Sequence, residues 1–320
     1  MIEDLLDPKS LPDATGTVRL LQTHISLVFV ADAFVYKVKK PVDFGFLDFS
    51  TLEKREHFCR REVELNQRLS KDIYLDVMPV FRDGNHHRLG GGKGTVVEYA
   101  VRMRRIPETV LMKSLFLKGD LTGDMLRDIA HVLARFHQSA DGSPEIDAFG
   151  EAAGFKINTD ENFEQTERYV GKTLKKEDFQ RLRAWTDAFY REGESLFRDR
   201  ILEGKIRDCH GDLHMEHICL TDPVSVIDCI EFNERFRYSD TLSDIAFLLM
   251  DLEYHDGKGP AEQFWKEYSE MTQEKGQEDL LTFYKVYRAY VRGKVISFQL
   301  DDPHVSGEEK ENAARRASRY

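Results

Sequence analysis

Six ionisable side chains lie close together in the stretch from Cys209 to Asn233, CHGDLHMEHICLTDPVSVIDCIEFN. Two short apolar runs within it, at residues 218–220 and 226–227, predict buried strands, and an Asp-Pro pair between them predicts the turn of a β-hairpin. We expect this hairpin to place Asp212 at the end of a loop and Asp228 at the end of the following strand, facing one another. Two carboxylates in that arrangement can hold a divalent cation against a phosphate while one of them takes a proton. The six side chains are His210, Asp212, His214, His217, Asp228 and Glu231.

These residues also allow a simpler interpretation as polar side chains satisfied within a loop. Burying unpaired charge is costly, however, so six such groups around two apolar strands are hard to explain by structure alone. We therefore interpret the stretch as a functional site.

A predicted strand with alternating polar and apolar residues lies near the N-terminus, far in sequence from this site. The run AFVYKVKK, residues 33–40, predicts a strand with Lys37 and Lys39 on one face and Tyr36 and Val38 on the other. The preceding run, THISLVFVAD, predicts its partner strand. A lysine on an inward face needs an acid or a phosphate as its partner, whereas an edge strand would leave both lysines in solvent.

The next predicted element is a helix that contains a carboxylate on its apolar face. Residues 50–53, Ser-Thr-Leu-Glu, have the pattern of a capping box and predict a helix that runs to about Leu69. Residues spaced at i, i+4, i+7 and i+11 share one face of this helix, which is apolar apart from Glu62. A buried carboxylate needs a cationic partner. We expect that partner to be Lys37, with Lys39 on the same strand face as the alternative.

The motif HGDLH, followed at this spacing by IDCIE, resembles the aminoglycoside phosphotransferase and choline-kinase family of small-molecule kinases. That family carries HGDxHxxN, then a strand and a metal-binding Asp, and His217 stands here in place of the Asn. The phrases VYKVKKPVDFGFLDFSTLEKR and RDCHGDLHMEHIC further resemble bacterial members that are often fused to a P-loop ATP-binding domain. The likeness spans roughly residues 15–300.

The resemblance implies an α+β, bilobal protein-kinase-like fold. A small antiparallel-sheet lobe with one helix would occupy residues 1–97, a hinge residues 98–106, and a mainly helical catalytic and acceptor-binding lobe residues 107–320. ATP would bind near the hinge, where the backbone at Met103 would hydrogen-bond the adenine. Ser26 lies where the nucleotide-positioning loop of the family passes over the phosphates.

The resemblance also implies that the γ-phosphate of ATP is moved to a hydroxyl of a small molecule. Asp212 would orient the acceptor hydroxyl and take its proton. Lys37, paired with Glu62, would orient the α- and β-phosphates, and Asp228 would bind Mg²⁺. Three further residues would brace the catalytic loop: His210, His214 and Asp244, the last of which would also cap its own helix.

His217 alters the expected set of metal ligands. Mg²⁺ is a hard ion that favours oxygen, so an imidazole is a poorer ligand than the amide oxygen of Asn. His217 could bind the metal through a water, the site could prefer Mn²⁺, or Glu231 could supply the missing oxygen. A slow or inactive enzyme is a fourth alternative.

Two other classes of function compete with a kinase. A pseudokinase that serves as a partner-binding module would bind ATP without turning it over. A zinc protein would leave Lys37, Glu62 and Asp228 without a role. Its candidate ligands, whose spacing fits only loosely, are Cys209, His210, His214, His217 and Cys219.

The remaining pattern predicts connecting and supporting elements. The glycine-rich run at residues 90–95 predicts a hairpin loop and is not a P-loop, because Lys93 is followed by Gly rather than Ser or Thr. The C-terminal half predicts an amphipathic helix at residues 123–140, a loop at 141–158, charged helices within 160–203, an apolar helix opened by Asp244, helices at 261–274 and 278–300, and a polar, frayed tail after Asp302.

Composition limits the classes of function further. The chain of 320 residues is 41% hydrophobic and carries a net charge of −11, which argues against general nucleic-acid binding. No apolar run approaches the length of a membrane span, and the acidic N-terminus lacks an apolar signal core. Four cysteines without a secreted-type framework predict reduced thiols and a cytoplasmic protein.

Acidic residues around the predicted hairpin suggest a weak preference for an amine-bearing or neutral acceptor over a sugar phosphate, because a negative field concentrates cations. The alternative is that these acids only solvate helix faces, and Arg235 and Arg237 could instead recruit an anion. The acids concerned are Glu231, Glu234, Asp240, Asp251 and Glu253.

Overall fold

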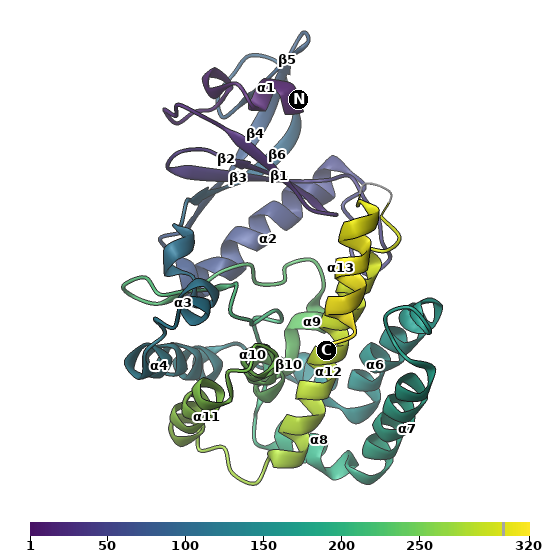
Figure 1. Cartoon of the computed structure of the whole chain (residues 1–320). Helices are drawn as coiled ribbons and strands as arrows, with labels where there is room; N and C mark the ends of the chain where they lie inside the picture. The colour runs from purple at the N-terminus through teal and green to yellow at the C-terminus, as the bar shows by residue number, and fades with distance from the viewer. Residues whose placement is uncertain (303–304) are drawn as a thin grey trace. The chain divides into compact units, whose positions relative to one another are not determined.

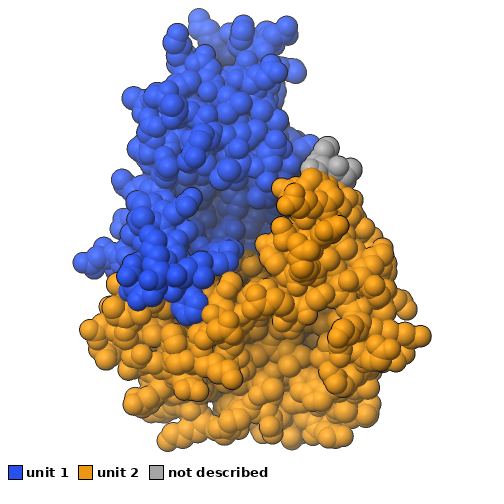
Figure 2. All heavy atoms as spheres, viewed as in Figure 1, with its two compact units in different colours: residues 1–120, 216–234 blue, residues 121–215, 235–320 orange. Residues whose placement is uncertain are grey.

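The chain divides into two compact units in the computed structural model, which describes residues 1–302 and 305–320. Unit 1 consists of residues 1–120 and 216–234, and unit 2 of residues 121–215 and 235–320 (Figure 2). Unit 1 contains an antiparallel sheet with one long helix, and unit 2 is mainly helical (Figure 1). The predicted α+β class is therefore confirmed.

The sheet of unit 1 has six strands in the order β1-β2-β3-β6-β4-β5, and neighbouring strands are antiparallel. We predicted two strands before residue 40, but β1 is an additional strand, because the Thr23 hydroxyl accepts the amides of Ile25 and Ser26 and turns the chain there. The strand β5 is likewise inserted between β4 and β6, which pair with each other directly. The strands are β1 Arg19–Gln22, β2 Ser26–Val30, β3 Phe34–Lys39, β4 Tyr74–Asp83, β5 His86–Leu89 and β6 Thr95–Arg104.

The two faces of this sheet are covered differently. Tyr36 and Val38 of β3 lie in an apolar cluster with Leu27 and Phe29 of β2 and with Leu5 of the short helix α1 (Ile2–Leu5). Helix α2 (Leu52–Ser70) packs against β4 and β6. Because side chains alternate along a strand, the two lysines of β3 point to the opposite face from Tyr36 and Val38.

Helix α2 begins one residue later than a capping box at residues 50–53 would place it. Its N-cap is Thr51, whose hydroxyl accepts the amide of Lys54, so Ser50 is not the cap. Its buried side is also more polar than predicted, and polar groups there need internal partners. The buried residues are Arg55, Cys59, Glu62, Leu65, Asn66 and Ser70.

The hairpin predicted around Asp222 and Pro223 is confirmed. Strands β8 (Ile218–Cys219) and β9 (Ser225–Val226) pair antiparallel within unit 1. The Leu220 amide donates to the Val110 carbonyl at 2.7 Å, which ties the hairpin to the segment before helix α3 (Met112–Lys118).

Helix α10 (Thr241–Tyr254) is the most deeply buried element of unit 2, with every residue from Thr241 to Leu252 buried. It packs against α11 and α12, and a two-stranded ladder of β7 (Ile206–Asp208) and β10 (Tyr238–Asp240) precedes it. The other helices of unit 2 are α4 Gly123–Ser139, α5 Pro144–Asp147, α6 Ala152–Thr166, α7 Lys176–Glu192, α8 Glu194–Leu202, α11 Lys258–Thr272, α12 Glu278–Phe298 and α13 Gly307–Ala317. The short helix α9 is Glu234–Arg237. Single 3₁₀ turns lie at Pro8–Ser10 and Glu108–Val110 in unit 1 and at Ala148–Gly150 and Glu167–Tyr169 in unit 2.

Two predictions about unit 2 were wrong. Residues 141–158, predicted as a loop, contain α5 and the start of α6, which buries Phe155. The chain after Asp302, predicted to be frayed, forms α13 from Gly307, where Ser306 and Glu309 make a capping box. The part of that prediction that falls on residues 303–304 lies outside the described residues.

The helices described within residues 1–302 and 305–320 include none that combines the length and the apolar character needed to cross a membrane.

Candidate functional site

In unit 2, the segment that carries the HGD motif is held by one buried carboxylate of α10. The amide of His210 donates to Asp244 Oδ2 at 2.7 Å, and the amide of Gly211 donates to Asp244 Oδ1 at 2.9 Å. Gly211 has φ of 86°, a left-handed conformation that suits glycine. From α12, Arg288 donates to the Gly211 carbonyl at 2.8 Å. The backbone just before Asp212 is therefore fixed from two helices.

Asp244 does not cap its own helix, contrary to our prediction. The N-cap of α10 is Asp240, whose side chain accepts the amide of Leu242. Asp244 is one turn further along, so its carboxylate is free to bind the loop. Burial raises the pKa of Asp244, but the hydrogen bond from His137 and the charges of His210 and Arg288 outweigh it and lower that pKa to about 2.

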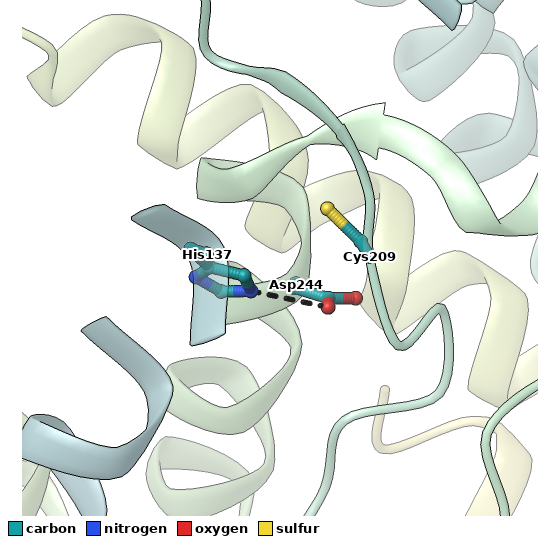
Figure 3. Close-up of side chains that lie close together, drawn as sticks. All are labelled: His137, Cys209 and Asp244. Carbon is teal, nitrogen blue, oxygen red and sulfur yellow. Dashed lines mark hydrogen bonds and ion pairs between the residues drawn. The ribbon is translucent and has the colours of Figure 1, made fainter. Parts of the chain in front are cut away.

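His137, Cys209 and Asp244 lie together in the interior of unit 2 (Figure 3). His137 Nε2 is 3.4 Å from Asp244 Oδ2, and its Nδ1 is 2.8 Å from the Tyr268 hydroxyl. The Cys209 thiol donates to the Ser239 carbonyl at 3.3 Å, and burial raises its pKa well above the ordinary value. Each group thus already has a protein partner. The contacts of this cluster brace the loop, and of its members only Cys209 is among the predicted zinc ligands.

Asp212 itself is partly exposed, with 32% of its side-chain surface accessible. Its Oδ2 lies 3.5 Å from Nε2 of the buried His214, and the same Nε2 lies 3.5 Å from Arg292 Nη1. Burial disfavours the charge of Arg292, but Asp212 raises the pKa of the guanidinium above its ordinary value. Asp212 is thus an accessible carboxylate on a rigid loop beside a permanent cation.

Arg288 and Arg292 have no role predicted from the sequence. They lie far along the chain from the HGD motif, and one helical turn separates them on α12. The regular spacing of two arginines on a helix is a signal, but it does not tell which segment they contact.

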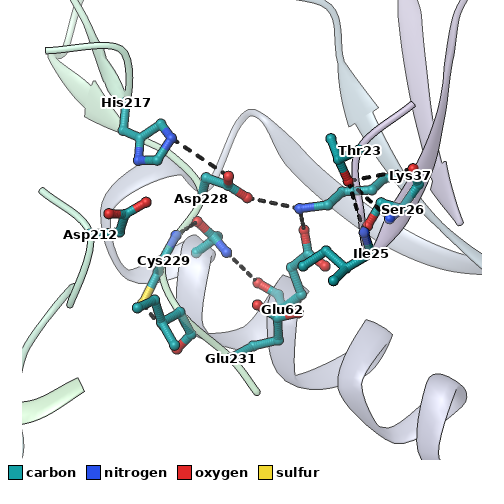
Figure 4. Close-up of polar contacts among 12 residues, drawn as sticks. Thr23, Ile25, Ser26, Lys37, Glu62, Asp212, His217, Asp228, Cys229 and Glu231 are labelled. Carbon is teal, nitrogen blue, oxygen red and sulfur yellow. Dashed lines mark hydrogen bonds and ion pairs between the residues drawn. The ribbon is translucent and has the colours of Figure 1, made fainter. Parts of the chain in front are cut away.

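In unit 1, Glu62 of α2 binds both lysines of β3. Figure 4 shows the contact with Lys37. Lys37 Nζ is 2.8 Å from Glu62 Oε1, and Lys39 Nζ is 2.6 Å from Glu62 Oε2. Lys37 also reaches Asp228 Oδ1 at 2.8 Å, and Lys39 contacts Glu231. The alternative between Lys37 and Lys39 therefore resolves into a pair that shares one glutamate.

The charges of this cluster support one another. Burial lowers the pKa of each lysine, but Asp228 and Glu62 raise that of Lys37, and Glu231 and Glu62 raise that of Lys39. Burial raises the pKa of Glu62, but the two lysines lower it below its ordinary value. Burial prevails at Glu231, where the net effect is a raised pKa.

The predicted metal ligands differ in how open they are. The Asp228 side chain is 46% exposed, and its Oδ2 lies 3.6 Å from His217 Nε2. The Glu231 side chain is 6% exposed and is bound by Lys39. Mg²⁺ is commonly bound by one or two carboxylates together with substrate phosphates. Asp228 fits that role, and His217 is near enough to contribute, whereas the position of Glu231 does not favour it.

Two predicted nucleotide contacts lie in unfavourable places. Ser26 is fully buried at the start of β2, so the exposed part of this turn is Thr23 and His24. Met103 lies within β6, whose neighbours β3 and β4 pair with it on both sides. The amides of Arg104 and Arg105 donate to Ile73 and Ala33. The direct contacts predicted for Ser26 and Met103 are therefore not favoured by the structure.

Comparison with known proteins places this geometry in a family. Residues 46–281 match the model of the phosphotransferase enzyme family. Uncharacterized proteins of Mycobacterium bovis and Mycobacterium tuberculosis are each 35% identical over 290 residues, covering 90% of this chain and 56% of theirs. The chain thus spans about half the length of the curated relatives it matches. A choline/ethanolamine kinase family protein from Mesorhizobium loti matches with a TM-score of 0.54 at 14% identity, covering 99% of this chain and 92% of that one.

The fold is therefore of the protein-kinase-like class seen in small-molecule phosphotransferases. Because the family model matches most of the sequence, the chain belongs to the phosphotransferase enzyme family.

Proposed function

We propose that this phosphotransferase moves the γ-phosphate of ATP to a hydroxyl group of a small molecule. The observation that carries the proposal is Lys37, which bridges Glu62 and the exposed carboxylate of Asp228 in unit 1. A cation held by a buried glutamate and next to a free-standing carboxylate can bind phosphate oxygens while the carboxylate binds a metal.

The nucleotide side of the reaction belongs to unit 1. Lys37 would orient the α- and β-phosphates, and Asp228 would hold Mg²⁺ or Mn²⁺, with His217 contributing directly or through a water. The metal would neutralise phosphate charge when bound. The predicted hinge at residues 98–106, between lobes at residues 1–97 and 107–320, stays a proposal, and the part of it that lies beyond strand β6 is residues 105–106. Within the hinge, the amide of Ile106 has no partner among the described residues, so it replaces Met103 as the proposed donor to adenine.

The acceptor side belongs to unit 2. Asp212 would accept the proton of the acceptor hydroxyl while the hydroxyl oxygen of the acceptor bonds to the γ-phosphorus. The bond from that phosphorus to the bridging oxygen then breaks, and ADP leaves with the electron pair. Asp244 and Arg288 keep the loop of Asp212 rigid, so little reorganisation is needed during transfer. Such catalysis depends mainly on positioning and electrostatics.

The acids that suggested a preference for an amine-bearing or neutral acceptor are mostly neutralised by neighbours. Asp240 binds Arg200 at 2.7 Å, and Glu253 binds Lys285 at 2.9 Å. Asp251 is buried, where it accepts a backbone amide. Ion pairing therefore weakens the long-range field of these acids, and the preference for an amine-bearing or neutral acceptor stays a prediction.

Two aspartate variants test the proposal. Asp212→Ala should abolish transfer while nucleotide binding stays near that of the wild type, and Asp228→Ala should remove metal-dependent nucleotide binding. Asp120→Ala, at an exposed aspartate, is the matched control. ADP release is measured across hydroxyl-bearing metabolites and aminoglycosides, and nucleotide binding by calorimetry with and without Mg²⁺.

Wild-type turnover in both variants would place the active site elsewhere. ATP binding without ADP release on any acceptor would favour the pseudokinase alternative, to which the His217 substitution draws attention.

A further inference from the structure

A second lysine, Lys39, is buried in the nucleotide side of unit 1. Its side chain is 1% exposed, and its Nζ lies 4.8 Å from the centre of the Phe49 ring. Both of its carboxylate partners, Glu62 and Glu231, are buried as well. Lys37, in contrast, is 15% exposed and contacts the accessible Asp228. Only one of the two lysines is therefore placed to meet a ligand.

The segment from Asp228 to Glu231 is attached to α2 and β4 at several points. The Cys229 amide donates to Asn66 Oδ1 at 2.9 Å, and Asn66 Nδ2 donates to the Glu62 carbonyl at 2.8 Å. The Asp228 amide donates to the Tyr74 hydroxyl at 3.1 Å. Asp228 has φ of 62°, a left-handed conformation that costs free energy for a residue with a Cβ. Such a conformation persists only where its surroundings hold it.

We infer that the Lys39–Glu231 ion pair is a positioning device that fixes Asp228 against α2. Lys39 then contacts no nucleotide, and Glu231 binds no metal. The inference rests on the proposed function, because it takes Asp228 to be the metal-binding residue.

The order of charges explains why a second lysine is present. Glu231, Lys39, Glu62, Lys37 and Asp228 form a chain in which anions and cations alternate. When Lys37 turns to the phosphates and Asp228 to the metal, Glu62 would lose its cation if Lys37 were its single partner. Lys39 remains bound to Glu62 throughout, so α2 and the segment of Asp228 keep their positions.

A double-mutant cycle on the nucleotide-free protein tests the pair without any activity. Lys39→Met leaves two buried carboxylates without their shared cation and should lower the Tm by about 5–10 °C. Adding Glu231→Gln removes one of these charges. The Tm of the double variant should therefore be higher than the value expected from adding the Tm changes of the two single variants. Lys54→Met, which removes an exposed lysine from its ion pair with Asp48, is the control and should change the Tm by about 1 °C or less.

Nucleotide binding separates a positioning role from a direct one. The Lys39→Met/Glu231→Gln variant, in which Asp228 is no longer held by the pair, should bind ADP within about threefold of the wild type without Mg²⁺ but at least about fivefold more weakly with it, whereas Lys37→Met should bind at least about tenfold more weakly in both conditions. The positioning role also predicts that Glu231→Gln shifts the Mg²⁺ requirement by less than about threefold.

Three results would overturn the inference. One is strictly additive Tm changes in the cycle, and another is a double variant that binds ADP as poorly as Lys37→Met without Mg²⁺, or as well as the wild type with it. The third is a tenfold higher Mg²⁺ requirement in Glu231→Gln at unchanged Tm, which would make Glu231 a metal ligand. If the wild type binds no nucleotide, the proposed function fails, while the unfolding cycle still decides whether Lys39 and Glu231 are coupled.

Discussion

Replacing Asp244 with asparagine tests how firmly the loop before Asp212 is held. The two carboxylate oxygens of Asp244 accept the amides of His210 and Gly211 at 2.7 and 2.9 Å, and its side chain is wholly buried. Asparagine has the same shape but one acceptor oxygen. The NH₂ group of the asparagine would therefore face one of the two backbone N–H groups. Both are hydrogen-bond donors, so that backbone amide would have no acceptor.

The structure gives the magnitude of the loss in two ways. One charge-assisted hydrogen bond and one buried amide left unpaired are together worth about 3 kcal/mol. The pKa of Asp244, lowered from 3.8 to about 2, corresponds to about 2 kcal/mol of stability from its ionised state. We therefore expect Asp244→Asn to reduce the free energy of unfolding by about 2–3 kcal/mol at pH 7.

The sign of the pH dependence follows from the lowered pKa. The contribution of ionised Asp244 is complete above the unfolded-state pKa and is lost as the pH falls from 3.8 towards 2. The asparagine variant has no such group. Its deficit in urea unfolding should be the same at pH 7 and about pH 5, and smaller by about 1 kcal/mol at about pH 3.

Asp251→Asn is a matched control on the same helix. Asp251 is also buried, but it accepts one loop amide, from Met215 at 3.0 Å. Its replacement should therefore cost about half as much as that of Asp244. An Asp244→Asn variant that is at least as stable as Asp251→Asn, or whose deficit in unfolding free energy is the same at pH 3 as at pH 7, would show that Asp244 does not hold the loop in this way.

Two further predictions concern stability in unit 2. Arg200→Met removes a fully buried guanidinium that binds Asp240 and Glu274, so urea unfolding should show a loss of about 3–5 kcal/mol. Arg181→Met, which removes an exposed ion pair with Asp178, should change the free energy of unfolding by about 0.5 kcal/mol or less. Equal losses in Arg200→Met and Arg181→Met would contradict this prediction. Burial lowers the pKa of Lys294 to about 8, so the charged lysine destabilises the folded state fully below that pH. This cost becomes smaller as the pH rises from about 8 to the ordinary pKa of 10.5. Relative to Lys294→Met, the wild type should gain about 2 kcal/mol in unfolding free energy from pH 7 to about pH 9.5, and parallel pH profiles would refute this.

Patterns with a short period predicted the local structure well. Alternation in β3 placed Lys37 and Lys39 on the face opposite Tyr36, and two apolar runs around an Asp-Pro pair gave the hairpin β8–β9. These features depend on neighbours in sequence, which the chain itself specifies.

The missed helices lack a strong apolar stripe. Helix α6 buries Asn158, Thr159 and Asn162 beside its phenylalanines, so its sequence resembles a polar loop. Helix α13 is mostly polar, and its buried residues, Ala313 and Ala317, pack against Ile296 of α12. Tertiary burial of polar and small residues decides both cases, and periodicity does not record it. The capping box of α13 was nevertheless visible in the sequence and could have indicated where that helix begins.

The two lysines of β3 show where sequence spacing stops being informative. Residues two apart on a strand point the same way, so Glu62 can pair with either, and the structure shows that it pairs with both. What separates them is depth, because Lys39 lies under Phe49 while Lys37 reaches the surface beside Asp228. Phe49 belongs to the segment between β3 and α2, and the residue types of β3 do not encode where that segment packs. We therefore propose that Lys37, the more exposed of the two lysines, contacts the phosphates. Because Lys39 is buried, its loss should lower the stability of the fold more than the affinity for nucleotide.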